Sequence, residues 1–317
     1  MAVDPDLRLK VRHFLKKHQR LIIFIIVILI IIITINRILV SLKPKPELTT
    51  TYTPHISVLD NTSEVPDKVE KSFESFIEKY VIYCNTGDYT NAWNLVSKEC
   101  KENLFNNSYT NFVEYVQTKF NSHKRYAIQD YSNYEDKYIY SVKIFDDYLA
   151  TGLTNQTYLY QEEKMVASYD ENKNIVFSVG NYMGSHKINA MNANEYLRVE
   201  VKEAIEKYEF IIYKVKFTNI KDYTVVIQDE NSNTNEVLIN IGSENRGPEN
   251  IFNIILKPGE TKELELSFAK FYDSNLAVNS LILNSVRILE NYTGNPDFAE
   301  QEIANAIDKF SMTIPLN

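Results

Sequence analysis

The sequence predicts an N-terminal transmembrane helix, then an α+β domain with three helices and a curved antiparallel sheet, and finally an all-β sandwich. Three observations support this: an uninterrupted apolar run at Leu21–Ile35, helical spacing of apolar residues over 69–120, and alternating patterns from residue 125 onward. At 317 residues the chain can form about two ordinary domains and an anchor. The expected parts are a basic tail (1–20), a transmembrane helix (21–42), a stalk (43–66), an α+β domain (67–187) and a β-sandwich with a C-terminal helix and strand (188–317).

The apolar run is long enough to cross a bilayer. Leu21–Ile35 would cover roughly 22 Å as an α-helix, and continuation to Leu42 gives roughly 33 Å, against a hydrocarbon core of about 30 Å. No small-x-small cleavage site or lipoprotein cysteine follows the run, and no polar face interrupts it. An uncleaved anchor is therefore favoured over a signal peptide, a lipoprotein or a buried core helix. Residues 43–66, rich in Pro, Thr and Ser, predict an extended stalk.

Charge sets the expected orientation. Six Lys/Arg precede the run, and only Arg37, Lys43 and Lys45 follow it closely, so the positive-inside rule places the N-terminus in the cytoplasm and the later domains outside the cell. Beyond residue 45 the chain holds 25 basic and 40 acidic residues, a net charge of about −15. A protein that binds the phosphate backbone needs the opposite balance, so direct nucleic-acid binding is not expected.

Three helices are expected in the α+β domain. Apolar residues at three-and-four spacing over 69–84 predict the first, which ends at Asn85-Thr86-Gly87. Asp88 is a good N-cap for a second helix that extends to Leu104. A third short helix, capped by Ser108 or Asn107, would end near Phe120.

Strand patterns follow His123. Four strands complete the α+β domain: 125–132, 137–145, 157–168 and 174–181. Seven more indicate a sandwich: 196–202, 210–219, 224–228, 237–241, 252–256, 262–269 and 281–289. The paired Cys and core Trp of antibody domains are not in this stretch, so "immunoglobulin-like" describes the architecture only. Asp297–Phe310 predicts a helix, and Ser311–Leu316 an edge strand or a docked segment.

The two cysteines, Cys84 and Cys100, fall on apolar helix stripes. In an antiparallel helical hairpin Cys100 would lie roughly 18 Å along the second helix. Bridged Cα atoms must lie within about 7 Å, so buried free thiols are favoured over a disulfide in another helix arrangement.

Chemical motifs are sparse. The five histidines show no metal-ligand spacing, and no phosphate loop, nucleophile elbow or zinc-protease motif is present. Asp229–Glu236 begins like a calcium loop, but Thr234 stands where Gly is required and Asn240 where a bidentate Glu is required. A polar hairpin turn is expected there instead. We expect no catalytic, cofactor-binding or metal-binding residues.

Carboxylates near the first strands are the strongest catalytic candidates, because a curved sheet can enclose a pocket around a general base. They are Asp130, Asp136, Asp146, Asp147, Glu162 and Glu163. Most of them lie next to lysines or in predicted turns, which favours positions on the solvated surface over a catalytic role. The tyrosines of YAIQDYSNYEDKYIYSV favour ordinary strand packing over an aromatic recognition surface.

The segment FIEKYVIYCNTGDYTNAWNLVS gives a helix, a Gly-Asp turn and an Ala-Trp helix before the strands. Over residues 67–187 this order resembles the nuclear transport factor 2-like (ketosteroid isomerase-like) cone fold. Cone domains serve as enzymes, ligand pockets and assembly modules, so the resemblance alone does not select a function.

A basic tail, one membrane helix, a stalk and an outer cone domain together resemble the inner-membrane assembly subunit of type IV secretion and conjugation machines, including Gram-positive relatives. The sandwich after the cone departs from that pattern. The resemblance implies a protein that works through interfaces and carries over no catalytic residue. The composition, rich in Asn, Ile, Lys and Tyr, is common in proteins from AT-rich bacterial genomes.

The sequence therefore predicts a non-enzymatic, single-pass membrane scaffold whose outer domains bind protein partners. Expected partners are the membrane, other envelope or secretion-machine proteins, and further copies of the chain. Two alternatives stay open. One is a small-molecule sensor or enzyme that uses the cone's cavity, and the other is a stress factor that binds envelope polymers through the sandwich.

Overall fold

The computed structural model describes residues 64–147, 160–229, 236–250, 253–272, 277–295 and 297–316, all within one compact unit. The predicted tail (1–20), transmembrane helix (21–42) and residues 43–63 of the predicted stalk lie outside these ranges. Among the helices within them, none combines the length and hydrophobicity needed to cross a membrane. The described fold is mostly antiparallel β-sheet with a few helices, arranged as an α+β part followed by a β-sandwich.

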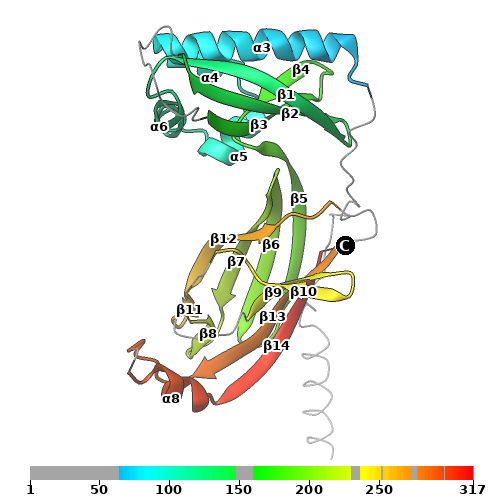
Figure 1. Cartoon of the computed structure of the whole chain (residues 1–317). Coiled ribbons are helices and arrows are strands. Elements are labelled where there is room, and N and C mark those ends of the chain that lie inside the picture. Colours follow the sequence, from blue (N-terminus) through cyan, green and yellow to red (C-terminus); the bar gives the residue numbers. More distant parts are fainter. Residues whose placement is uncertain are drawn as a thin grey trace, which may run out of the picture. The chain divides into compact units, whose positions relative to one another are not determined.

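The α+β part contains four helices and a four-stranded sheet (Figure 1). The helices are α3 (Asp67–Thr86), α4 (Tyr89–Leu95), α5 (Lys98–Phe105) and α6 (Tyr109–Lys119). The strands, β1 (Lys124–Tyr134), β2 (Lys137–Asp146), β3 (Tyr160–Tyr169) and β4 (Ile175–Ser178), pair antiparallel in the order β1-β2-β3-β4. The predicted change from helices to strands after His123 is confirmed.

Helix α3 forms as its apolar spacing predicts. Val69, Phe73, Ile77, Tyr80 and Cys84 lie on one stripe and are all buried. The predicted stop is confirmed, because Gly87 follows the helix with φ +75°, a left-handed conformation that glycine adopts without steric cost. The predicted N-cap of the next helix is also confirmed, since the Asp88 carboxylate accepts a hydrogen bond from the Asn91 backbone N–H.

The prediction of one continuous second helix was wrong, and the α+β part therefore has four helices instead of three. Val96 is extended (ψ 138°) and forms a β-bridge with Phe177 of β4. Ser97 then caps a new helix, because its hydroxyl accepts a hydrogen bond from the Cys100 N–H at 3.2 Å. The Ser97 hydroxyl also pairs with that of Ser178 at 2.9 Å, so the break attaches the helical layer to β4.

Stacked rings fill the core between α3 and the sheet. Phe73 stacks on Tyr140 with ring centroids 3.6 Å apart, and Tyr80 meets Phe177 edge-on at 5.6 Å. Tyr140, the buried tyrosine of β2, thus packs against α3, as ordinary strand packing predicts.

Ten strands and helix α8 (Ala299–Ala304) form the rest of the described chain. The strands are β5 (Tyr182–Ala193), β6 (Leu197–Lys207), β7 (Phe210–Asn219), β8 (Thr224–Gln228), β9 (Val237–Ile241), β10 (Glu244–Arg246), β11 (Ile254–Leu256), β12 (Thr261–Ala269), β13 (Val278–Leu289) and β14 (Asp308–Pro315). One sheet has the order β12-β7-β6-β5, and the other six strands form the second sheet. Apolar residues of both sheets share one buried core, which makes this part a sandwich.

Residues 230–235 of the expected hairpin turn at Asp229–Glu236 lie outside the described ranges, but the strands on either side, β8 and β9, each pair with β13 and not with each other. Val226 of β8 pairs with Arg287 of β13, and Leu238 of β9 pairs with Ile282 of the same strand. Strand β14 occupies the opposite edge of β13 along this length. β8 and β9 therefore follow one another along a single edge of β13 and are not the two strands of a hairpin.

Strand β5 belongs to both parts of the molecule. Its first residue, Tyr182, is buried in the core of the α+β part, whereas Ile188 and Ala190 lie in the core of the sandwich. The predicted domain boundary between residues 187 and 188 falls inside this strand. Sequence patterns missed β5 because small and polar residues break its alternation.

The predicted C-terminal helix at Asp297–Phe310 was too long. Helix α8 ends at Ala304, and β14 begins at Asp308. The Ile307 N–H donates to the Ile288 carbonyl of β13 at 2.8 Å, and Met312 is buried beyond it. Sheet pairing and burial of alternate residues stabilise the strand, so the helical pattern ends early.

Candidate functional site

Two buried glutamates, Glu163 and Glu206, are the strongest candidates for a functional site. They are 2% exposed each. A carboxylate removed from water is costly unless charges and hydrogen bonds compensate it, so the partners of each glutamate show what it does.

Glu163 lies on β3, on the same face as Met165 and Ala167 of the core. Its carboxylate accepts hydrogen bonds from the Tyr115 hydroxyl, the Gly180 backbone N–H and the Lys119 ammonium. Helix α6 is thereby attached to β3 and to the turn after β4. One cation and two further donors compensate the buried charge.

The groups around Glu163 are held in their neutral forms. Burial, with the Glu163 charge adding to it, raises the pKa of the Tyr115 and Tyr80 hydroxyls well above their usual value. Burial also raises the pKa of both the Cys84 and Cys100 thiols to about 12. The cysteines are free and buried, as predicted. Neither thiol is a nucleophile at neutral pH, because the thiolate is the reactive form.

Glu206 lies at the end of β6, between the sandwich and the α+β part. Its carboxylate is 2.7 Å from the Lys270 ammonium, through Oε2, and 3.1 Å from His186 Nε2, through Oε1. Burial acts to raise the pKa of Glu206, but His186 and Lys270 outweigh it and hold the pKa far below its usual range. Burial lowers the pKa of Lys270, and the Glu206 charge opposes that change.

Aromatic rings surround this charge pair. The Lys270 ammonium lies 4.3 Å from the ring centroid of Tyr134 and 5.3 Å from that of Tyr272. The Tyr272 hydroxyl donates to the Tyr208 carbonyl at 2.8 Å. Tyr134 closes the β1–β2 hairpin, so the pair joins that hairpin to the sandwich. Ile139, Val166 and Met183 complete this cluster, which we call the aromatic joint.

Helix α5 makes a second contact with the sandwich. The Glu99 carboxylate accepts hydrogen bonds from the Ser185 backbone N–H at 2.8 Å and from the Ser185 hydroxyl at 2.9 Å. Asn103 donates to Tyr182 and Ser185 of the same strand. Ile205 of β6 is buried in the core of the α+β part. Two contacts therefore fix the sandwich to the α+β part at separate points.

Of the six carboxylates that the sequence nominated, the structure buries only Glu163. Asp130 and Asp136 are exposed, and Glu162 is paired with Lys164 at 2.9 Å. Asp146 is paired with Lys124 at 2.8 Å, and Asp147 with Arg125 at 3.4 Å. These five are surface or ion-pair positions. Glu206 was missed, because KEAIEK has the composition of a solvated strand end.

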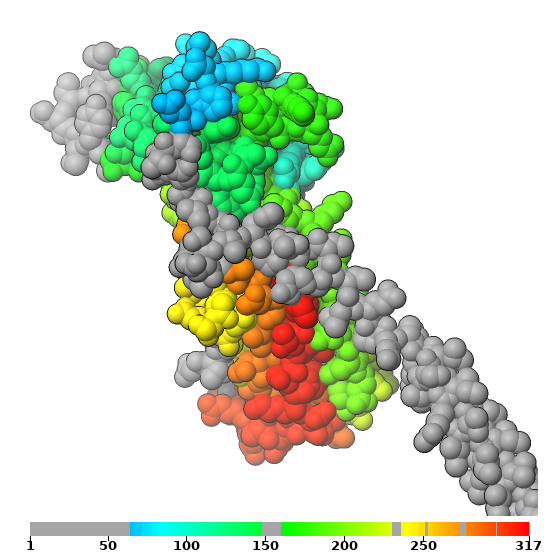
Figure 2. Space-filling view, turned by 90° about the vertical axis from the view of Figure 1, so that its right-hand side faces the viewer, coloured from blue at the N-terminus to red at the C-terminus, as the bar shows by residue number. Residues whose placement is uncertain are grey.

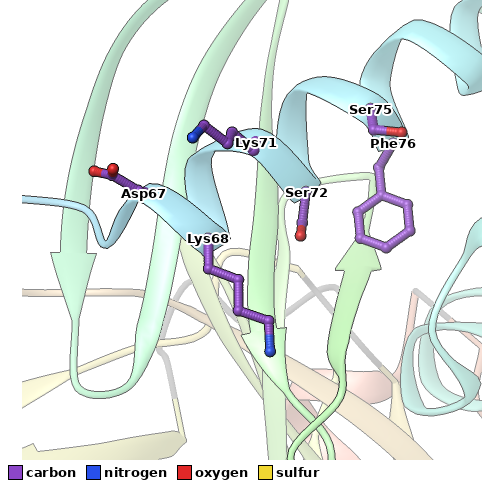
Figure 3. Close-up of a pocket in the computed structure, with 6 residues that line it drawn as sticks. All are labelled: Asp67, Lys68, Lys71, Ser72, Ser75 and Phe76. Atoms are coloured by element: carbon purple, nitrogen blue, oxygen red, sulfur yellow. The ribbon is translucent and has the colours of Figure 1, made fainter.

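A surface hollow lies on α3 (Figure 3). Its volume is about 550 Å³, and it is lined by Asp67, Lys68, Lys71, Ser72, Ser75 and Phe76. Lys68, Ser72 and Phe76 project from one side of the helix, and Lys71 projects away from them. All six residues belong to α3, so the hollow has one wall and cannot surround a small molecule.

The described residues thus use their buried charges to attach one element to another. Among them, no three His, Cys, Asp or Glu side chains are grouped closely enough to hold a metal ion. Comparisons with protein-family models, with curated proteins and with solved structures found no match.

Proposed function

We propose that the protein is a non-enzymatic, membrane-anchored scaffold whose two outer parts bind protein partners in the cell envelope. The observation that carries this proposal is the use of two buried glutamates, Glu163 and Glu206, as attachment points. Glu163 attaches α6 to β3, and Glu206 attaches the sandwich to the β1–β2 hairpin. A scaffold needs its binding surfaces held in fixed relation, and charge pairs of this kind supply that.

The apolar run at Leu21–Ile35 and the basic residues before it support the anchor and its orientation. They motivate a narrower form of the proposal, in which the scaffold belongs to a Gram-positive conjugation machine. The order of tail, apolar run, stalk and α+β part motivates that form, together with the nuclear transport factor 2-like turn GDYTNAW. An immunoglobulin-like sandwich would supply a second binding surface.

Crosslinking in intact cells tests the scaffold. The full-length chain would carry a photo-crosslinking residue at an exposed position such as Glu171 or Tyr109, and crosslinked products would be identified by mass spectrometry. We expect defined products with envelope proteins. A matched chain with the crosslinker at buried Ile239 should give none.

The outcomes separate the three functions. Recovery of only the chain itself, as a monomer, would overturn the scaffold. Retention of the chain on purified cell wall would favour the polymer-binding alternative. Saturable binding of a small molecule that depends on Glu163 would favour a sensor or enzyme.

A further inference from the structure

Strand β1 is an edge strand whose outer side is partly occupied by one side chain. β1 pairs with β2 and is the last strand at this end of the sheet among those that the structure describes. The Lys124 N–H donates to Asn85 Oδ1, and the Asn85 Nδ2 donates to the Lys124 carbonyl, both at 2.8 Å. The Asn85 side chain therefore pairs with the outward N–H and C=O of Lys124 in the way that a neighbouring strand would. In an antiparallel edge strand, every second residue points its backbone N–H and C=O away from the sheet. The N–H and C=O of Tyr126 and Ile128 therefore point outward on the same side as those of Lys124.

Helix α3 carries an acidic row beside this strand. Glu70, Glu74 and Glu78 stand on successive turns and are all exposed. Desolvation raises the pKa of the Tyr126 hydroxyl, and the negative charges of Glu78 and Glu74 raise it further. These two carboxylates are therefore close enough to β1 to influence a side chain of that strand. Among the residues that the structure describes, none of the three carboxylates has an ion-pair partner. Figure 2 shows the blue atoms of α3 directly beside green atoms of the α+β part.

The edge also exposes large apolar side chains. Ile128 and Tyr131 of β1 are 37% and 36% exposed, and Ile82, one turn beyond Glu78, is 51% exposed. Proteins usually blunt long edge strands with charges, proline or a bulge. Here Asn85 covers Lys124 and a bulge follows Ile128, so the outward backbone groups of Tyr126 and Ile128 stay able to pair with a partner strand.

We propose that the β1 edge and the Glu70, Glu74 and Glu78 row bind an extended basic segment of a partner protein, which adds to β1 as a further strand. Alternate strand residues are about 6.8 Å apart, and residues four apart in a helix are about 6 Å apart. Lys or Arg at alternate positions of the incoming strand can therefore each reach one carboxylate, and their aliphatic stems lie on the same face of the sheet as Ile128.

Charge argues for this occupant over a second copy of the chain. The sequence beyond residue 45 carries about −15, and a symmetric contact would bring two acidic rows together. The inference rests on the proposed scaffold function and specifies the chemistry of one partner segment.

A peptide-binding measurement tests the inference. Fluorescence anisotropy would follow a labelled nine-residue peptide with Lys at alternate positions and Thr or Val between them, titrated with the full-length chain in detergent. We expect saturable binding that weakens about tenfold in the triple variant Glu70→Gln, Glu74→Gln, Glu78→Gln. The matched control, Glu171→Gln, Glu195→Gln, Glu300→Gln, removes the same charge from exposed positions elsewhere and should bind normally.

A second variant tests the strand edge. Ile128→Pro removes an outward N–H, which an edge strand tolerates, and should abolish binding while circular dichroism stays unchanged. Equal weakening by both triple variants, or unchanged binding by Ile128→Pro, would overturn the proposal. Self-association lost in Ile128→Pro would assign the edge to a second copy. Failure of the peptide to bind, with crosslinked partners still recovered in cells, would refute this inference and leave the scaffold intact.

Discussion

The Glu206 carboxylate and the Lys270 ammonium lie 2.7 Å apart, with side-chain exposures of 3% and 5%. Burial of either charge alone would be costly, and together they bring β6 and the residue after β12 against Tyr134 of the β1–β2 hairpin. This pair attaches the sandwich to the α+β part.

Removal of one member should therefore destabilise the protein strongly. Glu206→Gln leaves the Lys270 charge buried beside rings, and we expect a loss of about 3–5 kcal/mol in the free energy of unfolding. The double variant Glu206→Gln, Lys270→Met should recover much of that loss, because no unpaired charge remains. Urea denaturation of the full chain, followed by circular dichroism, measures both. A double variant no more stable than Glu206→Gln would contradict this account.

The same pair predicts a pH dependence. The folded-state pKa of Glu206 is depressed by His186 and Lys270, against the opposing effect of burial. Its contribution to stability is therefore fully present above the unfolded-state pKa of about 4.3 and is lost as pH falls toward the folded-state pKa. We expect the free energy of unfolding to decrease more steeply below about pH 5 in the wild type than in Glu206→Gln. The exposed control Glu171→Gln should keep the wild-type slope.

The Cys84 and Cys100 thiols should be unreactive in the folded protein. Burial raises the pKa of Cys84 and Cys100 to about 12, so a maleimide reagent at pH 8 should leave both unmodified and should label both after denaturation in urea. Mass spectrometry counts the added groups. Rapid labelling of either cysteine in the native chain would show that the helical layer opens.

Because neither native thiol should react, a cysteine introduced at a chosen position can report on which side of the membrane that position lies. Glu171→Cys supplies one exposed thiol in the α+β part. In intact cells an impermeant maleimide should label it, because that part is expected outside the membrane. Ala2→Cys, in the expected cytoplasmic tail, should react only after the membrane is opened. Labelling of both in intact cells would contradict the predicted orientation.

Gly180 offers a further stability test. It adopts φ +70°, and an added Cβ would clash with Leu104 Cδ2. Gly180→Ala should therefore cost about 1–3 kcal/mol through backbone strain and repacking. Gly259→Ala has nearly the same φ, +69°, with no atom within 4 Å of the added Cβ. Its smaller cost isolates the backbone contribution, and equal losses in the two variants would exclude a packing effect.

Local patterns predicted elements well where one face is buried. The α3 stripe, the Gly87 stop and the Asp88 cap depend on residues close in sequence, and the structure has all three. The helix breaks at Ser97 because of contacts with Phe177 and Ser178, about eighty residues away. Local helix propensity contains no sign of these contacts, so the prediction continued the helix through the break.

Buried charges were predictable only in part. Glu163 shares its strand face with Met165 and Ala167, and that alternation was a usable sign of a carboxylate facing the core. Glu206 had no such sign. A bulge after Val201 changes the alternation of β6, and the compensating charge comes from Lys270, far along the chain.

Strand β5 also bears on how such a protein can change over generations. Genes often exchange whole domains when recombination falls in a connecting segment. Here the α+β part and the sandwich share the strand Tyr182–Ala193, so a crossover at residue 187 would divide a strand whose start lies in one core and whose end lies in the other. The two parts are therefore expected to be inherited, and transplanted by an engineer, as one cassette.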